Sequence, residues 1–155
     1  MKKKFTSTLR VIGNLPYHMT SPILFKVFDE AAAIKDLTIM VQREVAGRMT
    51  SVPGTKEYGI LSVMTKFYGT AKSLFTVSPN CFYPKPKVTS TVMSIRLYDT
   101  LPHSKIDSEL FRLVVRTVFG KRRKTLRNSV QYLPYDEDSI ERIVRESPIS
   151  MNKRP

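Results

Sequence analysis

The order of apolar segments in the first 50 residues limits the fold more than any other feature of this sequence. Residues 37–41, Leu-Thr-Ile-Met-Val, form a nearly continuous apolar run, which is typical of a strand covered on both faces. A β-prone run at residues 9–13 precedes a helical pattern that we expect Ser21 to cap, and a second helical segment at residues 43–49 follows the buried run. Strand, helix, strand, helix in this order predicts a parallel sheet with right-handed crossovers.

The pattern changes in the middle of the chain. A helix expected over residues 58–67 precedes two β-rich segments, residues 72–77 and 88–98, which a connector with three prolines joins. Two strands joined in this way should be antiparallel neighbours at a sheet edge. After these strands the chain turns helical. We therefore predict an α/β domain over residues 1–100 and a small helical domain over residues 101–155.

Three helices are expected in the helical domain. Asp107 is placed to cap the first helix and Asp136 to cap the third, while Gly120 interrupts the first before a second, basic helix. Residues 121–127, called the basic segment below, contain five cations: Lys121, Arg122, Arg123, Lys124 and Arg127. Such a density attracts phosphate and releases counterions on binding. The alternative interpretation is a solvated helix face.

The excess of positive charge favours a polyanionic partner. The chain has 155 residues with 26 Lys+Arg against 13 Asp+Glu, which gives a formal net charge of +13. Its 41% of hydrophobic residues can bury a core, which argues against a disordered basic tail. No apolar run approaches the roughly 20 residues of a membrane span, and no apolar region of a secretory signal follows the basic residues 2–4. We expect a soluble, cytoplasmic protein without a membrane partner.

Cysteine and histidine content argues against a metal site. Cys81 is the only cysteine, so the chain has no disulfide framework of its own and no multi-cysteine metal site. We expect Cys81 to be a small buried residue. The two histidines, His18 and His103, have no companion at a metal-ligand spacing. We therefore expect no metal cofactor.

The tetrapeptide Asn14-Leu15-Pro16-Tyr17 directly follows the first expected strand. Ligands of parallel sheets bind outside the carboxyl ends of the strands, so these residues lie where a substrate would bind. The Asn14 amide oxygen and the Leu15 carbonyl can accept both N–H groups of an adenine N6 amine, which localises its lone pair toward a methyl donor. Pro16 keeps Leu15 extended, and Tyr17 offers a ring for stacking worth about 1–3 kcal/mol. The alternative is an ordinary turn followed by a core tyrosine.

A second ring stands in the proline-rich connector. Phe82 lies on a loop stiffened by Pro84 and Pro86, where it could cover the other face of an extruded base. The alternative is that Phe82 fills the core while the prolines protect a sheet edge. Glu44 and Arg48, at helical spacing after the buried strand, either pair with each other or contact RNA.

Five motifs occur in a fixed order over roughly residues 9–130. They are Asn14-Leu15-Pro16-Tyr17, Gln42-Arg43-Glu44-Val45-Ala46-x-Arg48, Tyr58-Gly59-x-Leu61-Ser62, Phe82-x-Pro84-x-Pro86-x-Val88-x-Ser90 and Phe119-x-x-Arg122-Arg123-Lys124-Thr125-Leu126-Arg127-Asn128. In this combination the chain resembles the small-subunit ribosomal RNA adenine N6,N6-dimethyltransferase family.

The resemblance implies an S-adenosylmethionine-dependent enzyme that dimethylates two adjacent adenosines near the 3′ end of the small-subunit rRNA. Its partner would be the immature small ribosomal subunit, and the protein would be monomeric. Residues 1–100 would be the C-terminal part of a Rossmann-like methyltransferase domain. Residues 101–155 would be an RNA-docking helical domain, truncated at its C-terminus. The acceptor asparagine, which also touches the cofactor in the family, maps onto Asn14, and the stacking aromatics map onto Tyr17 and Phe82.

The chain departs from the family in its cofactor site. Only ten residues precede Val11, and the six glycines form no Gly-x-Gly cluster, so most of the S-adenosylmethionine site is missing. We therefore expect negligible activity of this chain by itself. Two alternatives are a large-subunit rRNA methylase of erythromycin-resistance type and a non-catalytic nucleic-acid-binding relative of the same fold. Leu15, the pattern of residues 82–90 and the intact tetrapeptide favour the small-subunit enzyme.

Overall fold

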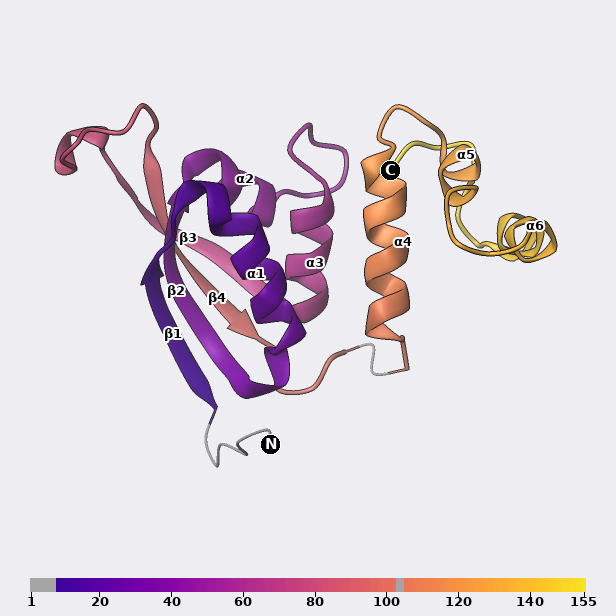
Figure 1. Cartoon of the computed structure of the whole chain (residues 1–155), viewed down its shortest axis with the longest axis horizontal. Helices are drawn as coiled ribbons and strands as arrows, with labels where there is room; N and C mark the ends of the chain where they lie inside the picture. The colour runs from indigo at the N-terminus through magenta and orange to yellow at the C-terminus, as the bar shows by residue number, and fades with distance from the viewer. Residues whose placement is uncertain (1–7, 103–104) are drawn as a thin grey trace. The chain divides into compact units, whose positions relative to one another are not determined.

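The computed structural model describes residues 8–102 and 105–155. The chain forms two compact units, which divide between residues 103 and 104 (Figure 1). The basic residues 2–4 and His103, on which two of the predictions depend, lie outside the described residues. No helix in the described part of the chain is long and apolar enough to cross a membrane.

The first unit is built on a four-stranded sheet. In spatial order its strands are β1 (Leu9–Asn14), β2 (Ile34–Gln42), β4 (Ser90–Leu97) and β3 (Gly69–Val77). Strands β1 and β2 are parallel, whereas β4 runs antiparallel to both β2 and β3. The predicted parallel strand–helix–strand unit and the antiparallel pair at the sheet edge are therefore confirmed. The carboxyl ends of β1, β2 and β3 and the start of β4 share one edge, called the rim below.

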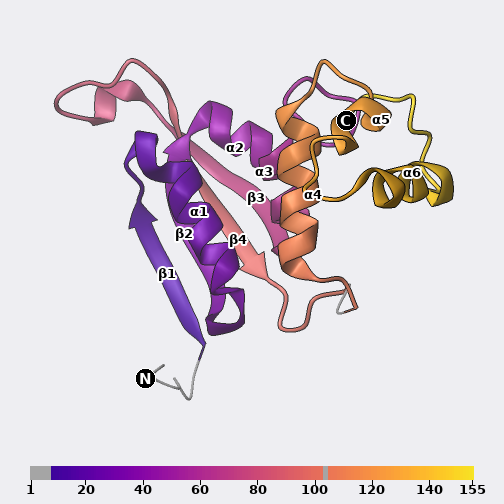
Figure 2. The same ribbon diagram turned by 45° about the vertical axis from the view of Figure 1, so that its right-hand side comes forward.

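Helices cover one face of this sheet (Figure 1 and Figure 2). The helical elements are η1 (Tyr17–Met19), α1 (Thr20–Asp29), η2 (Ala31–Ala33), α2 (Arg43–Thr50), α3 (Ile60–Tyr68) and η3 (Pro79–Cys81). Apolar side chains of the helices and of β2 and β4 form the core, with Leu24, Met64 and Ile95 fully buried. Within it Phe28 stacks on Tyr68 with ring centroids 5.1 Å apart. This core holds the rim in place.

The prediction that β2 is covered on both faces is wrong. Leu37, Ile39 and Val41 are buried, but Met40, between two of them, is only partly buried. On β1, Ile12 points to the same face as Met40 and is 84% exposed. Helices α1 to α3 all lie on the opposite face, so alternate residues of β2 lack a described covering layer. The apolar Met40 concealed this alternation in the sequence.

Helix α1 begins two residues earlier than expected, and Ser21 does not cap it. The short helix η1 continues into α1, so helical geometry already exists when the chain reaches Ser21. The N-cap residue is Met19, which contributes no side-chain hydrogen bond. Instead, the Thr20 hydroxyl donates to the Pro16 carbonyl at 3.2 Å. The helix start is thereby tied to the predicted substrate-binding tetrapeptide.

The second unit contains three helices, α4 (Ser108–Gly120), α5 (Leu126–Val130) and α6 (Glu137–Glu146). Both predicted caps are confirmed: the Asp107 carboxylate accepts from the Glu109 N–H at 2.8 Å, and the Asp136 carboxylate accepts from the Ser139 N–H at 2.8 Å. The buried core of this unit consists of Val118, Val130, Leu133 and Ile140.

The basic segment is not a helix over its first half, contrary to the prediction. Helix α4 ends at Gly120, and the next four residues form turns in which the Lys124 N–H donates to the Lys121 carbonyl at 2.7 Å. The Thr125 hydroxyl then accepts from the Asn128 N–H and begins α5. Because Thr125 is a favoured capping residue, it starts a new helix after the first four cations, and only Arg127 of the basic segment lies within that helix.

Candidate functional site

The rim brings together four chain segments that are far apart in the sequence. Asn14 at the end of β1 pairs with Met40, and the Leu15 N–H donates to the Met40 carbonyl at 3.1 Å. Across the sheet, Ser90 at the start of β4 pairs with Gln42 at the end of β2 and with the last residue of β3. The predicted tetrapeptide and the loop between β3 and β4 therefore leave the sheet at the same edge.

Two hydrogen-bond acceptors of the tetrapeptide are unused in the structure. Asn14 is exposed, and none of the described residues bonds to its side-chain amide. The Leu15 carbonyl also receives no hydrogen bond from the described residues. By contrast, the Pro16 carbonyl accepts from the Met19 N–H at 2.9 Å and from the Thr20 hydroxyl. The two acceptors assigned to an adenine amine are thus available, and the neighbouring carbonyl is committed to the fold.

Tyr17 is held at its hydroxyl end. Its side chain is partly buried in η1, and its hydroxyl lies 2.7 Å from the Ser90 hydroxyl, with either group able to donate. This bond joins the tetrapeptide to the start of β4 and so to the loop between β3 and β4. Nothing in the sequence around Tyr17 indicated Ser90 as its partner, because 73 residues separate the two.

The loop between β3 and β4, residues 78–89, presents its aromatic rings unequally. Phe82 is partly buried, whereas Tyr83 beside it is fully exposed. That Phe82 covers a base opposite Tyr17 stays a prediction. Tyr83 is an additional exposed ring, which the sequence analysis did not identify. Cys81 is exposed, contrary to the expectation of a buried residue, because η3 is a single turn within this loop. Pro84 and Pro86 follow in the same loop.

A hollow of about 430 Å³ lies at the start of α2, beside the rim. It is lined by Gln42, Arg43, Glu44, Gly47, Glu57, Val88 and Thr89. The Arg43 N–H donates to the Thr89 carbonyl at 3.0 Å, which joins the helix start to the end of the loop. Glu44 pairs with Arg48, as one of the two interpretations of their spacing predicted. Sequence reasoning did not foresee the hollow, because its walls come from three separate segments.

A single tyrosine organises the lysines of the basic segment. The Lys121 ammonium lies 4.4 Å from the centre of the Tyr132 ring, and the Lys124 ammonium donates to the Tyr132 hydroxyl at 2.6 Å. The hydrogen bond from Lys124, with the positive charge behind it, lowers the pKa of Tyr132 from its usual value of 10.0. Arg122 and Arg123 are exposed. Tyr132 had no signal in the sequence as a partner of the lysines.

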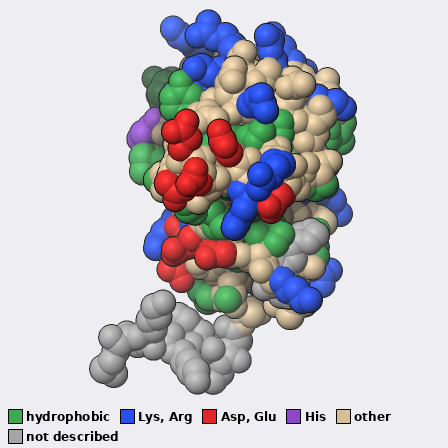
Figure 3. Space-filling view, turned by 90° about the vertical axis from the view of Figure 1, so that its right-hand side faces the viewer, with side chains coloured by type: hydrophobic (Ala, Val, Ile, Leu, Met, Phe, Trp, Pro, Cys, Tyr) green, Lys and Arg blue, Asp and Glu red, His purple; other side chains and the backbone are tan. Residues whose placement is uncertain are grey.

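Positive charge is not confined to the basic segment. Figure 3 shows one face of the molecule, on which Lys and Arg side chains stand at several separate places and Asp and Glu side chains gather in groups between them. Among the described residues no group of histidine, cysteine and acidic side chains is arranged to hold a metal ion. The exposed Lys and Arg side chains are suited to bind phosphate oxygens, which they contact through charged hydrogen bonds.

Sequence comparisons agree with the resemblance. The family model described as ribosomal RNA adenine dimethylase matches residues 1–153. Ribosomal RNA small subunit methyltransferase A of Alkaliphilus oremlandii is 41% identical over 157 residues, covering 99% of this chain and 55% of the relative. The protein of the same name from Chlamydia muridarum is 42% identical over 147 residues, covering 94% and 53%. The chain spans about half the length of these curated relatives.

Two solved structures share the fold. A dimethyladenosine transferase from Plasmodium falciparum superposes with a TM-score of 0.71 at 23% identity, covering 96% of this chain and 56% of that one. The 23S rRNA methyltransferase ErmE gives a TM-score of 0.60 at 23% identity, covering 96% and 59%. These likenesses confirm the predicted fold class, part of a Rossmann-like methyltransferase sheet followed by helices.

Proposed function

Because the chain belongs to the ribosomal RNA adenine dimethylase family, we propose that it carries the adenine-binding corner and the RNA-docking unit of an enzyme that dimethylates small-subunit rRNA. Residues 1–100 supply this corner, which consists of Asn14, Leu15, Pro16 and Tyr17. Residues 101–155 dock the substrate. The substrate in this proposal is the immature small subunit, with two adjacent adenosines near the rRNA 3′ end, and the protein acts as a cytoplasmic monomer. The 41–42% identity to relatives named for the small subunit supports this substrate over the erythromycin-resistance alternative.

S-adenosylmethionine supplies the methyl group in this proposal, but the residues of this chain fit only a part of its site. Asn14 offers an exposed amide at the carboxyl end of β1, where cofactors of such sheets bind. The described residues include no Gly-x-Gly turn after a strand, and the glycine with a positive φ, Gly54, lies in the loop between α2 and α3. Because the described residues supply only this part of a cofactor site, we expect no methyl transfer by the chain alone.

The two unused acceptors at Asn14 and Leu15 are the observation that carries the proposal. An adenine N6 amine is a weak nucleophile because its lone pair is delocalised into the ring. Hydrogen bonds from both N6–H groups to these oxygens would hold the nitrogen in a geometry that localises the lone pair. After methylation the nitrogen bears a surplus proton that is acidic enough to pass to water. The corner therefore needs no general base of its own.

Aromatic rings at the rim would hold the base for this chemistry. Tyr17 is anchored through its hydroxyl to Ser90, so its ring is kept in one orientation. Phe82, or the exposed ring of Tyr83, would cover the other face of the extruded base, with Pro84 and Pro86 restricting the loop. Stacking of this kind contributes about 1–3 kcal/mol per base.

The basic segment would bind the rRNA backbone. Its five cations, Lys121, Arg122, Arg123, Lys124 and Arg127, are all exposed, and Tyr132 orders two of them. Contacts with phosphate position RNA without reading its sequence. We therefore assign orientation of the substrate to this segment and selection of the target base to the corner.

The decisive experiment removes the adenine amine and leaves the rest of the RNA unchanged. The chain is titrated with a hairpin RNA whose loop contains two adjacent adenosines, and with the same hairpin carrying purine, which lacks the N6 amine, at both positions. Two hydrogen bonds of ordinary strength should make the adenine hairpin bind about tenfold more tightly. Asn14→Ala should remove most of this difference, because one acceptor is lost.

Asn152→Ala is the matched control, since it removes an exposed amide from the second unit. It should leave the preference for adenine intact. Equal binding of the two hairpins by the unsubstituted chain would contradict the proposed role of the corner. An adenine preference that survives Asn14→Ala would contradict the assignment to Asn14.

A further inference from the structure

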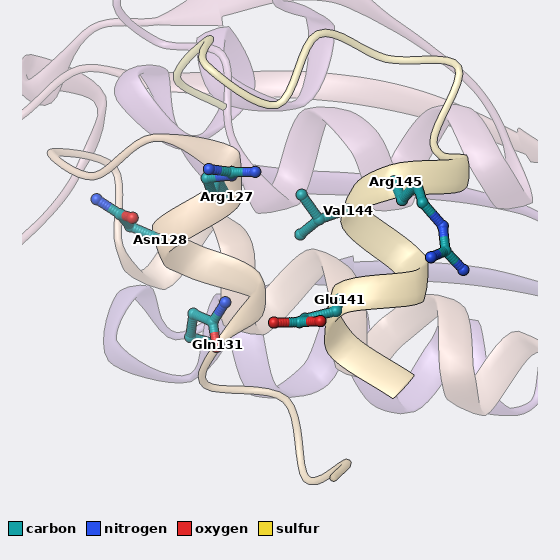
Figure 4. A pocket seen from close by; sticks show the side chains of 6 residues that line it. All are labelled: Arg127, Asn128, Gln131, Glu141, Val144 and Arg145. Atoms are coloured by element: carbon teal, nitrogen blue, oxygen red, sulfur yellow. The ribbon is translucent and has the colours of Figure 1, made fainter. Parts of the chain in front are cut away.

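A groove between α5 and α6 has a chemistry that the basic segment does not explain. It encloses about 730 Å³ and is lined by Arg127, Asn128, Gln131, Glu141, Val144 and Arg145 (Figure 4). Both walls belong to one packed unit, because Val130 and Leu133 on one side share a core with Ile140 on the other. The groove is therefore a property of the second unit alone.

The side chains divide the groove into two ends of opposite character. In Figure 4, Arg127 and Val144 point into the space between the helices, and the Glu141 carboxylate points toward α5, near Gln131. Asn128 turns away from this space. Arg145 extends along the outer side of α6, where it lies 3.8 Å from Glu146. The groove thus has a cationic end at Arg127 and an anionic end at Glu141.

Arg127 and Glu141 do not neutralise one another or any described neighbour. No ion pair joins either of them to another described residue, and both are exposed. Arg127 and Gln131, four residues apart, share one face of the α5 segment. A ligand with an anionic group at one end and N–H donors at the other would satisfy both ends.

A guanine nucleotide has this distribution of groups. Its phosphate accepts hydrogen bonds from a guanidinium, for which arginine is the preferred partner. Its base presents two neighbouring N–H donors, at N1 and N2, to a carboxylate, and its O6 accepts from a side-chain amide such as that of Gln131. Val144 would contact the ring. Adenine and cytosine place a ring acceptor beside their amine and so would face the charge of Glu141 with a lone pair.

We propose that the α5–α6 groove binds a guanine nucleotide of single-stranded RNA, with a phosphate at Arg127 and the base at Glu141 and Gln131. The inference rests on the proposed function, since it assumes that the chain binds RNA. The basic segment and the groove are joined at Arg127, because this residue is the last cation of the segment and also lines the groove. A strand held by the basic segment would lead directly into the groove. Sequence-specific RNA recognition commonly reads unpaired bases in this way.

The test compares fluorescently labelled RNA octamers by anisotropy, using the 155-residue chain. One octamer is all uridine, and the others carry a single guanosine, adenosine or inosine at the centre. The guanosine octamer should bind about tenfold more tightly than the uridine octamer, as expected of one well-made base contact. Inosine, which lacks the N2 amine, should retain only part of this preference.

Glu141→Gln should abolish the preference for guanosine. Glu137→Gln is the matched control, because it removes the same charge from an exposed position of α6 that does not line the groove. Both variants should bind the uridine octamer with the same affinity as each other, and only the control should keep the preference. Arg127→Ala should weaken binding of every octamer.

The outcomes separate the two proposals. Binding of all octamers with equal affinity by the unsubstituted chain would overturn the guanine site and leave the RNA-binding function standing. A preference that persists in Glu141→Gln, or inosine binding as tightly as guanosine, would likewise overturn the site. Failure to bind any octamer or the adenine hairpin would overturn the proposed function itself.

Discussion

The corner at Asn14–Tyr17 and the basic segment at Lys121–Arg127 are constructed in different ways. The corner is held by the backbone bond from Leu15 to Met40 and by the bond between Tyr17 and Ser90, so two further strands determine its position. The basic segment is a turn followed by the start of α5, and one surface ring orders its lysines.

This difference matches the physics of the two tasks. A hydrogen bond to an amine requires a donor–acceptor distance of about 3 Å and a good angle, so its acceptors must be fixed in advance. Attraction between cations and phosphates extends over about 10 Å at moderate salt and tolerates side-chain movement. Substitutions in the basic segment should therefore mainly lower the salt-dependent affinity for RNA. Substitutions in the corner should mainly lower the selectivity for the base.

Removal of three cations from the basic segment should have the largest effect. Arg122→Ala, Arg123→Ala and Lys124→Ala together should lower RNA affinity about a hundredfold at low salt and reduce the slope of log affinity against log salt by about 2. The slope is measured by anisotropy at several salt concentrations. Alanine at Lys26, Lys56 and Lys66 removes the same charge elsewhere and should change the slope much less. An unchanged slope in the first variant would contradict phosphate contact by the segment.

Substitutions of Tyr17 should have the next largest effect on RNA affinity, and the size of this effect should depend on whether the aromatic ring is kept. Tyr17→Leu should weaken binding of the adenine hairpin about tenfold, because stacking is lost. Tyr17→Phe keeps the ring and loses the bond to Ser90, so its main cost should be about 1 kcal/mol of unfolding free energy, measured by urea denaturation. If leucine and phenylalanine reduced hairpin affinity equally, the ring would have no part in binding the base.

Tyr132 should have the smallest effect, and its effect should depend on pH. Tyr132→Leu releases both lysines and should weaken RNA binding about threefold, in line with a surface cation–π contact. Lys124 lowers the pKa of Tyr132, so deprotonation adds a negative charge beside the lysines below the pH at which an ordinary tyrosine ionises. RNA affinity should fall as the pH rises through this lowered pKa. Tyr132→Phe should lack that alkaline step, and a step of equal size in the variant would contradict the assignment.

Several elements could be predicted because their signals are local. The order of strands and helices follows from apolar spacing, and Asp107 and Asp136 cap their helices through atoms two or three residues away. Ser21 was assigned wrongly because η1 begins the helical path before it. The prediction of a helix for the basic segment rests on the apolar helical pattern around it, whereas α4 ends at Gly120 and the cap at Thr125 begins a separate helix. The acceptors at Asn14 and Leu15 were proposed from the sequence, and the structure leaves both unused.

The sequence by itself determined the strand–helix order, the family and the residues that carry the proposed chemistry, because periodicity and contiguous motifs are properties of neighbouring positions. Only the tertiary structure decided which face of β2 is covered, that Ser90 anchors Tyr17, and that Lys121 and Lys124 both contact Tyr132. The α5–α6 groove likewise depends on the packing of two helices. Such pairings depend on how distant segments meet in space, and a contact between residues 17 and 90 leaves no trace in the local pattern around either one.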